Sequence, residues 1–208
     1  MNGQLITLEG GEGAGKSTAL GFIAERIRAR GHELVQVREP GGTEIGEAIR
    51  RLLLDPQHTA LCAETELLLM FASRAQLVRE IVQPALAKGA IVLSDRFTDA
   101  SFAYQGGGRG IEQGLIAELE RWACGIKPGL SILLDLPVEQ GLARARGRGP
   151  SDRIEHEATE FFERVRAAYR ARAAAEPERW RVIDASQAVD RVLQDLGAVI
   201  DHWLDAHA

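Results

Sequence analysis

A glycine-rich segment near the amino terminus has the residue types and spacing that bind phosphate groups. The segment Gly10-Gly11-Glu12-Gly13-Ala14-Gly15-Lys16-Ser17 directly follows the apolar run at 5–8. Backbone N–H groups can converge on phosphate oxygens only where no Cβ intervenes, and left-handed turns cost least for glycine. Lys16 offers a cation to the β- and γ-phosphates, and Ser17 offers a hydroxyl to Mg²⁺. The segment therefore predicts a nucleotide-phosphate site.

The residues on both sides of this segment support that prediction. A chance glycine-rich turn needs neither a strand before it nor a helix after it. Here an apolar run precedes the segment, and Leu20, Ile23 and Ile27 recur at helical spacing after it. A helix that begins at the loop directs the positive end of its dipole at the bound phosphates.

A carboxylate and an arginine, Asp95 and Arg96, end the apolar run Ile91 to Ser94. A carboxylate beside the phosphate loop can hold Mg²⁺ directly or through water, and a guanidinium can bind a phosphate with two hydrogen bonds. Asp135 ends another apolar run and is a rival metal ligand. A Leu-Pro pair follows Asp135 and indicates the start of a helix, so we favour Asp95.

The segment Arg38-Glu39-Pro40-Gly41-Gly42-Thr43 follows the apolar run at 34–37. In open parallel sheets the ligand crevice lies at the carboxyl ends of the strands, so Arg38 and Glu39 are candidates for its edge. The spacing equally allows a surface turn in which Thr43 caps the next helix.

The helical pattern at 64–88 places Met70, Phe71 and Arg74 within about one turn. An aromatic ring can stack on a base while an arginine bonds the edge of the base. The alternative is that Phe71 belongs to the core and Arg74 is solvated.

Three arginines, Arg144, Arg146 and Arg148, lie close together before the segment Gly149-Pro150-Ser151-Asp152-Arg153. A glycine-punctuated, arginine-rich loop in a protein with a phosphate loop suggests a lid that closes over the transferred group and excludes water. The alternative is a basic helix end that is favoured only by the helix dipole.

The composition is ordinary for a soluble globular protein, with 45% hydrophobic and 26% charged residues. A length of 208 residues favours a single domain, 1–208. The net charge of −5 argues against a general nucleic-acid binder.

With no secretory signal pattern and no apolar stretch long enough for a membrane span, we expect a cytoplasmic protein. Cys62 and Cys124 form neither a redox pair nor a zinc motif and are expected to be free core thiols.

Strands and helices alternate along the chain, which predicts an α/β fold with a parallel sheet covered on both faces. Glycine-rich interruptions at 106–110 and 147–150 are expected to be loops, where binding groups tend to lie. The expected strands are 5–8, 34–37, 91–94, 131–134 and 181–183, and the expected helices are 16–30, 43–54, 64–88, 111–124, 138–147, 155–175 and 188–206.

Taken in order, these segments resemble the bacterial thymidylate kinase family over nearly the whole chain. The resemblance rests on the phosphate loop, the 38–42 segment, Phe71-Ala72-Ser73-Arg74, Asp95-Arg96-Phe97, the 104–110 segment and the arginine-rich 144–153 segment. It implies a P-loop NTPase fold with a five-stranded parallel sheet, helices on both faces and an arginine-rich lid at about 144–153. It also implies transfer of the γ-phosphoryl group of ATP to dTMP with Mg²⁺, no membrane or nucleic-acid partner, and a homodimer.

The resemblance also implies roles for individual residues. Tyr104 would crowd the position of a 2′-hydroxyl and so select deoxyribose, and Glu12 would lie near the 3′-hydroxyl. The implied ATP-binding residues are Gly10, Gly11, Glu12, Gly13, Ala14, Gly15, Lys16, Ser17, Thr18, Arg144 and Arg148. The resemblance further implies that Arg38 and Arg96 bind the dTMP phosphate, that Phe71 stacks on thymine, that Arg74 and Gln105 bond the edges of the base, and that Ser101 lies near it. With Glu12 and Tyr104 these are the implied dTMP-binding residues. Ser17 and Asp95 would serve the metal.

One position departs from part of the family. Some relatives carry an arginine in the phosphate loop where this chain has Gly13, so the catalytic arginine should come from the lid. Arg148 is the first choice, with Arg153 or Arg144 as alternates, beside Lys16 and Arg96 in the catalytic set.

Two other functions remain open from the sequence. One is a kinase for another nucleoside monophosphate or a deoxynucleoside on the same scaffold. The other is an ATP-dependent switch that binds a partner protein and turns over no small molecule.

Overall fold

The predicted strands form a parallel sheet in the computed structural model, which describes residues 3–146 and 152–207. Within these residues the sheet contains β1 (Gln4–Gly10), β2 (Leu34–Arg38), β3 (Ile91–Asp95), β4 (Leu130–Asp135) and β5 (Trp180–Asp184), in the order β2-β3-β1-β4-β5. Each predicted strand is confirmed to within about two residues at either end. The register pairs both Leu8 and Arg38 with Asp95, so the charged residues that end β2 and β3 lie level with the end of β1.

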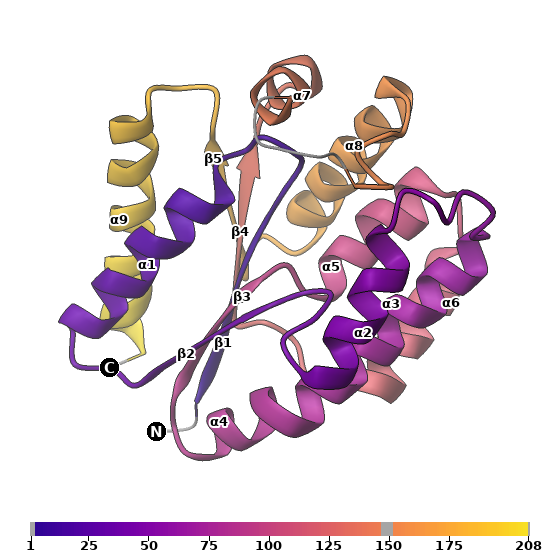
Figure 1. Ribbon diagram of the computed structural model, residues 1–208. Coiled ribbons are helices and arrows are strands. Elements are labelled where there is room, and N and C mark those ends of the chain that lie inside the picture. The colour runs from indigo at the N-terminus through magenta and orange to yellow at the C-terminus, as the bar shows by residue number, and fades with distance from the viewer. Residues whose placement is uncertain (1–2, 147–151, 208) are drawn as a thin grey trace.

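The helices cover the two faces of the sheet. Figure 1 shows α1 and α9 together on one side and α3, α5, α6 and α8 on the other. The α-helices in the described residues are α1 (Lys16–Ala29), α2 (Glu44–Leu54), α3 (Ala63–Leu77), α4 (Gln83–Ala87), α5 (Thr98–Ser101), α6 (Gln113–Leu119), α7 (Val138–Ala145), α8 (Thr159–Ala175) and α9 (Val189–Ala206). Three stretches continue these helices with wider π-helical turns: η1 (Val78–Val82), η2 (Phe102–Gly108) and η3 (Glu120–Cys124).

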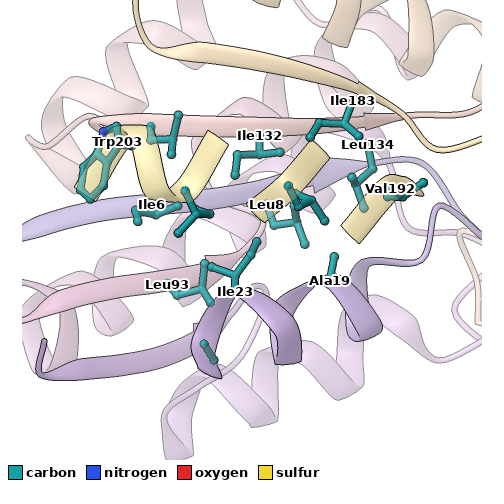
Figure 2. Packing of buried hydrophobic residues seen from close by; sticks show 14 of the residues in the cluster. Ile6, Leu8, Ala19, Ile23, Leu93, Ile132, Leu134, Ile183, Val192 and Trp203 are labelled. Carbon is teal, nitrogen blue, oxygen red and sulfur yellow. The ribbon is translucent and has the colours of Figure 1, made fainter. Parts of the chain in front are cut away.

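The core between the sheet and the pair α1 and α9 anchors the phosphate loop. Ile6 and Leu8 of β1 are fully buried against Ile23 of α1 and the apolar stripe of α9, as Figure 2 shows. Burying an aliphatic side chain of this size contributes roughly 1.5 to 3 kcal/mol. The strand before the loop and the helix after it are thus both fixed by packing.

The glycine-rich segment at 106–110 differs from the expected loop. Its first half belongs to the buried helical stretch η2, which packs on α8. A Cβ at Gly107 would lie 2.6 Å from the Ala168 Cβ, and one at Gly108 would lie 2.4 Å from the Phe161 ring. The glycines therefore allow two helical segments to approach closely, a requirement that the local sequence pattern does not reveal. Both cysteines are free as expected, although Cys62 is exposed and only Cys124 is in the core.

Candidate active site

The phosphate loop lies between β1 and α1 and has the predicted backbone. Gly13 and Gly15 have φ values of +70° and +86°, and α1 begins at Lys16. A Cβ at Gly13 would lie 2.0 Å from the carbonyl oxygen of Gly141 in α7. Any larger residue, including the arginine of some relatives, would have to displace α7 from the loop.

Lys16 reaches back over the loop. Its Nζ donates to the carbonyl oxygens of Gly10 at 3.2 Å and Gly11 at 3.0 Å. Burial, with a further contribution from the charge of Arg96, lowers the pKa of Lys16 to about 8. Burial and Arg96 thus destabilise the charged ammonium in the free protein, and a bound polyanion would stabilise it.

A cavity of about 280 Å³ opens beside the loop at the carboxyl ends of the first three strands. Its volume is near the lower end of the range for small-molecule sites. Among the described residues, five cations line it, Lys16, Arg38, Arg50, Arg74 and Arg96, together with five acidic residues, Glu12, Glu39, Asp95, Asp152 and Glu155. The other residues used below that line it are Gly13, Gly15, Ser17, Met70, Ser101, Tyr104 and Gln105.

The two candidate metal carboxylates have different surroundings. Asp135 makes two hydrogen bonds with Arg166, from Nε at 2.7 Å and from Nη2 at 3.0 Å. Asp95 Oδ1 is buried and has no hydrogen-bond partner in the described structure. An orphaned buried carboxylate oxygen is costly unless a cation or donor compensates it. Asp95 therefore fits a metal ligand and Asp135 does not.

The set of protein oxygens near Asp95 is small. Among the described residues, no group of three or more His, Cys, Asp or Glu side chains could hold a metal ion. Mg²⁺ commonly takes only one or two protein ligands and completes its shell with water and phosphate oxygens. Asp95 and Ser17, which line the same cavity, meet that requirement.

Arg96 contacts two other predicted site residues, Glu12 and Tyr104. Its Nη2 donates to Glu12 Oε1 at 2.9 Å, and its guanidinium lies 4.7 Å from the centre of the Tyr104 ring. The Tyr104 hydroxyl donates to the same Glu12 oxygen at 2.9 Å. Arg96 also donates from Nη1 to the hydroxyl of Tyr169, a residue of α8 that no sequence signal marked.

Glu9 is a second residue that the sequence pattern did not predict, and it holds the backbone beside Arg96. Arg96 has a φ of +67°, which is unfavourable for a residue with a Cβ. The buried Glu9 carboxylate accepts from the next backbone N–H, that of Phe97, at 2.9 Å and from the Tyr169 hydroxyl at 2.8 Å. Burial and the charge of Asp99 raise the pKa of Glu9 to about 8. The only sequence signal was a carboxylate inside an otherwise apolar strand.

Arg74 is 2% exposed and is not the solvated residue that one interpretation expected. It donates from Nε to Glu39, from Nη1 to Ser101 Oγ at 3.0 Å and from Nη2 to the Phe97 carbonyl oxygen at 3.1 Å. The structure thus brings Arg74 and Ser101 together.

Phe71 lies behind Arg74. The ring is 3% exposed, belongs to a core cluster and lies 4.6 Å from the Arg74 guanidinium. Among the described residues that line the cavity, its neighbour Met70 is present and Phe71 is not. The core interpretation of Phe71 is therefore the one that the geometry favours.

The segment at 38–43 fulfils both of its interpretations. Arg38 and Glu39 line the cavity, while the Thr43 side chain accepts from the Gly46 N–H and caps α2. Arg38 is half exposed and donates to Glu47 at 2.8 Å. Arg50 of α2, which the sequence pattern did not predict, also lines the cavity. It donates to the Pro40 carbonyl oxygen at 2.8 Å.

The two described candidates for the catalytic arginine, Arg144 and Arg153, bond different parts of the chain. Arg144 donates to the Ala185 carbonyl oxygen at 3.0 Å, at the turn between β5 and α9. Arg153 is 8% exposed and donates from Nε to the Leu53 carbonyl oxygen at 2.9 Å and from Nη2 to Glu66. Neither lines the cavity among the described residues. Arg148 lies outside the described residues.

Known proteins are similar to this chain in sequence and in fold. The family model for thymidylate kinase matches residues 8–196. A thymidylate kinase of Ectopseudomonas mendocina is 53% identical over 207 residues, or 99% of each chain. One of Pseudomonas putida is 52% identical over 206 residues, covering 99% of this chain and 98% of the relative. The crystal structure of thymidylate kinase from Ehrlichia chaffeensis superposes with a TM-score of 0.78 at 30% identity, covering 97% of this chain and 99% of that one.

The lowered pKa of Lys16 predicts a pH dependence of triphosphate binding. Below pH 8 the free protein already carries the charged ammonium, so binding takes up no proton there. Above pH 8 the ammonium is lost from the free protein, while bound phosphates raise the pKa, so each binding event must take up a proton. The Kd for a non-hydrolysable nucleoside triphosphate should then rise by up to about tenfold per pH unit above pH 8, as calorimetry would measure.

A Lys16→Arg variant provides the control, because guanidinium remains charged over this range. Its Kd should be nearly independent of pH even if binding is weaker. Since Glu9 also titrates near pH 8, a pH dependence that persists in Lys16→Arg would assign the effect to Glu9 and contradict the prediction.

Proposed function

The chain belongs to the thymidylate kinase family, and from this premise we propose how its residues carry out the family's reaction. The enzyme transfers the γ-phosphoryl group of ATP to dTMP, which yields ADP and dTDP for nucleotide biosynthesis. The observation that supports the residue roles most strongly is that the phosphate loop and the pocket around Arg74 and Arg96 line one cavity. Donor and acceptor phosphates can therefore meet without a large movement of the sheet.

On the donor side, the amides of the 10–17 loop and the α1 dipole bind the ATP phosphates. Lys16 leaves its loop carbonyls and neutralises charge that spreads over the transferred group. Asp95 and Ser17 would hold Mg²⁺, which supplies charge neutralisation at the phosphate oxygens. The orphaned Asp95 oxygen supports this assignment.

On the acceptor side, Arg38 and Arg96 bind the dTMP phosphate. That phosphate is largely ionised at pH 7, because its second pKa is about 6, so the reaction needs no general base. Tyr104 and Glu12, which are already hydrogen-bonded to each other, face the sugar. The Tyr104 ring fills space that a 2′-hydroxyl would need.

Around the base, Arg74, Ser101 and Gln105 supply polar contacts. We assign the face of the base to Met70, since it lines the cavity, and give Phe71 the role of supporting Arg74 from the core. Methionine sulfur makes favourable contacts with aromatic rings. This assignment replaces the stacking role that the family resemblance implied for Phe71.

The catalytic arginine of the lid is best assigned to Arg148. Arg153 is engaged with Glu66 and Leu53, and Arg144 is engaged with Ala185, so both alternates have structural partners elsewhere. An arginine that neutralises charge in this transition state contributes on the order of 10³ or more in rate.

The whole chain is proposed to act as a single kinase domain, because strands from residues 4 to 184 build one sheet. We place it in the cytoplasm, where ATP and deoxynucleotides are available. No helix in the described residues is long and apolar enough to cross a membrane.

A homodimer is the proposed assembly. Large apolar side chains are exposed on neighbouring helices of one side: Leu68 of α3 is 58% exposed, Leu115 of α6 is 52% exposed, and Trp122 of η3 is 79% exposed. The stretches α3 and η3 contact each other, and Figure 1 shows α3 and α6 on the same outer face. A second copy of the chain would remove this apolar surface from water.

An acceptor panel tests the function. We expect ADP release with dTMP to exceed that with UMP, CMP, AMP, GMP or thymidine by orders of magnitude. Only one methyl group distinguishes dUMP, which is worth about 1 to 3 kcal/mol, so dUMP should be a poor substrate and not an excluded one. Preference for another acceptor would identify a different nucleotide kinase. Slow hydrolysis that no monophosphate stimulates would indicate a partner-binding switch.

Replacement of Arg148 by alanine tests the lid assignment. We expect kcat to fall by about 10³, because the transition-state charge loses its partner, with a much smaller change in dTMP binding. Arg146→Ala removes an exposed arginine two positions away and serves as the control. A normal kcat for Arg148→Ala would exclude this residue as the catalytic arginine and direct attention to Arg153.

Charge substitution tests the dimer. Trp122→Glu should convert the enzyme from dimer to monomer in sedimentation experiments, since a carboxylate would be buried without a partner. Val189→Glu introduces the same charge at a 61% exposed residue of α9, on the other side of the sheet, and should leave the dimer intact. A monomeric wild type, or a dimeric Trp122→Glu variant, would refute the proposed interface.

A further inference from the structure

Glu66 of α3 is a buried carboxylate whose neighbours come from three separate parts of the chain. It is 1% exposed and does not itself line the cavity described above. Gln105 of η2 donates from Nε2 to Glu66 Oε1 at 2.9 Å. Arg109 donates from Nη2 to Oε2 at 3.0 Å, and Arg153 donates from Nη2 to the same oxygen.

These donors keep Glu66 ionised. Burial alone would raise the pKa of the Glu66 carboxyl, but hydrogen bonds from Arg109, Gln105 and Arg153 hold it below its ordinary value. An ionised carboxylate can only accept hydrogen bonds. The atom of Gln105 that faces Glu66 must therefore be its nitrogen, which removes the usual ambiguity between the two amide orientations.

The orientation has a consequence on the other side of the amide. Gln105 lines the cavity, and within the described part of the chain its Oε1 has no hydrogen-bond partner. Glu66 takes one of the two N–H groups and fixes the amide, so the carbonyl oxygen remains the amide's one acceptor for a ligand. The cavity thus presents a fixed acceptor at Gln105.

We propose that Glu66 is a positioning residue that selects the base of the acceptor nucleotide by fixing the amide orientation of Gln105. This inference rests on the proposed function. Thymine and uracil carry an N–H donor at N3, which matches a carbonyl oxygen. Cytosine carries a lone pair at N3, which opposes it. A site built to bond a substrate N–H discriminates strongly against an analogue that lacks the donor.

The test compares three acceptors in one variant. Glu66→Gln has both a donor and an acceptor amide atom, so it satisfies Gln105 in either orientation. The ratio of kcat/KM for dTMP to that for dCMP should fall at least about tenfold, because one unfavourable hydrogen-bond contact is relieved. The ratio for dTMP to dUMP should not change, since both bases carry the same N3 donor.

A charge-balanced variant guards against a folding defect. Glu66→Gln leaves Arg153 without its carboxylate, whereas Glu66→Gln combined with Arg153→Met removes one charge of each sign. Arg109 keeps its ion pair with Glu157 in both variants. The double variant should show the same fall in the dTMP to dCMP ratio, and ratios within one variant cancel any change in the amount of active enzyme.

Glu157→Gln is the matched control. It removes a carboxylate from the same cluster, one that contacts Arg109 and not Gln105 in the described structure, so both ratios should stay at their wild-type values. An unchanged dTMP to dCMP ratio in a folded Glu66 variant would overturn the proposal, as would a parallel fall in the dTMP to dUMP ratio. A wild type without preference for dTMP would instead refute the proposed function.

Discussion

Buried acidic side chains hold the walls of the cavity in fixed relative positions. Glu9, Glu39 and Glu66 are at most 6% exposed, and each accepts hydrogen bonds from residues of other elements. Removing one partner from a buried ion pair costs roughly 3 to 5 kcal/mol, because the other charge is left uncompensated. Pairs such as Glu39 with Arg74 therefore tolerate little displacement, and loops that are distant in sequence keep one arrangement.

The same pairs explain how an acidic chain can bind two phosphorylated substrates. The net charge is −5, but in the described part of the chain five cations are matched by five acidic residues around one cavity of about 280 Å³. Glu39 orients Arg74 and Glu12 orients Arg96, so each guanidinium has a fixed direction before a phosphate arrives. Preorganised charge of this kind stabilises a transition state without the reorganisation that water would require. The positive φ of Arg96, held by the hydrogen bond from Phe97 to Glu9, is part of that preorganisation.

Close packing of small residues sets where the helices meet the site. Gly13 touches Gly141, which seats α7 directly on the phosphate loop. Gly107 and Gly108 bring η2 against α8, and α8 carries the Tyr169 that contacts Arg96. In both places a Cβ would occupy space already filled by another element, so the glycines link the packing of the fold to the chemistry of the cavity.

The sequence by itself determined the elements and the phosphate loop, because apolar periodicity and glycine spacing are local properties of the chain. Strand positions, the Lys16 loop and the placement of Asp95 and Arg96 at a strand end followed from it. Only the tertiary structure decided that Asp135 is paired with Arg166 and that, among the described residues, Met70 and Arg50 line the cavity and Phe71 does not. It also decided that Tyr169 contacts Arg96 and that Glu9 bonds Tyr169. These contacts depend on which side chains from distant segments are buried against each other. Burial gives a charged or aromatic side chain a fixed contact, and a local sequence pattern does not specify it.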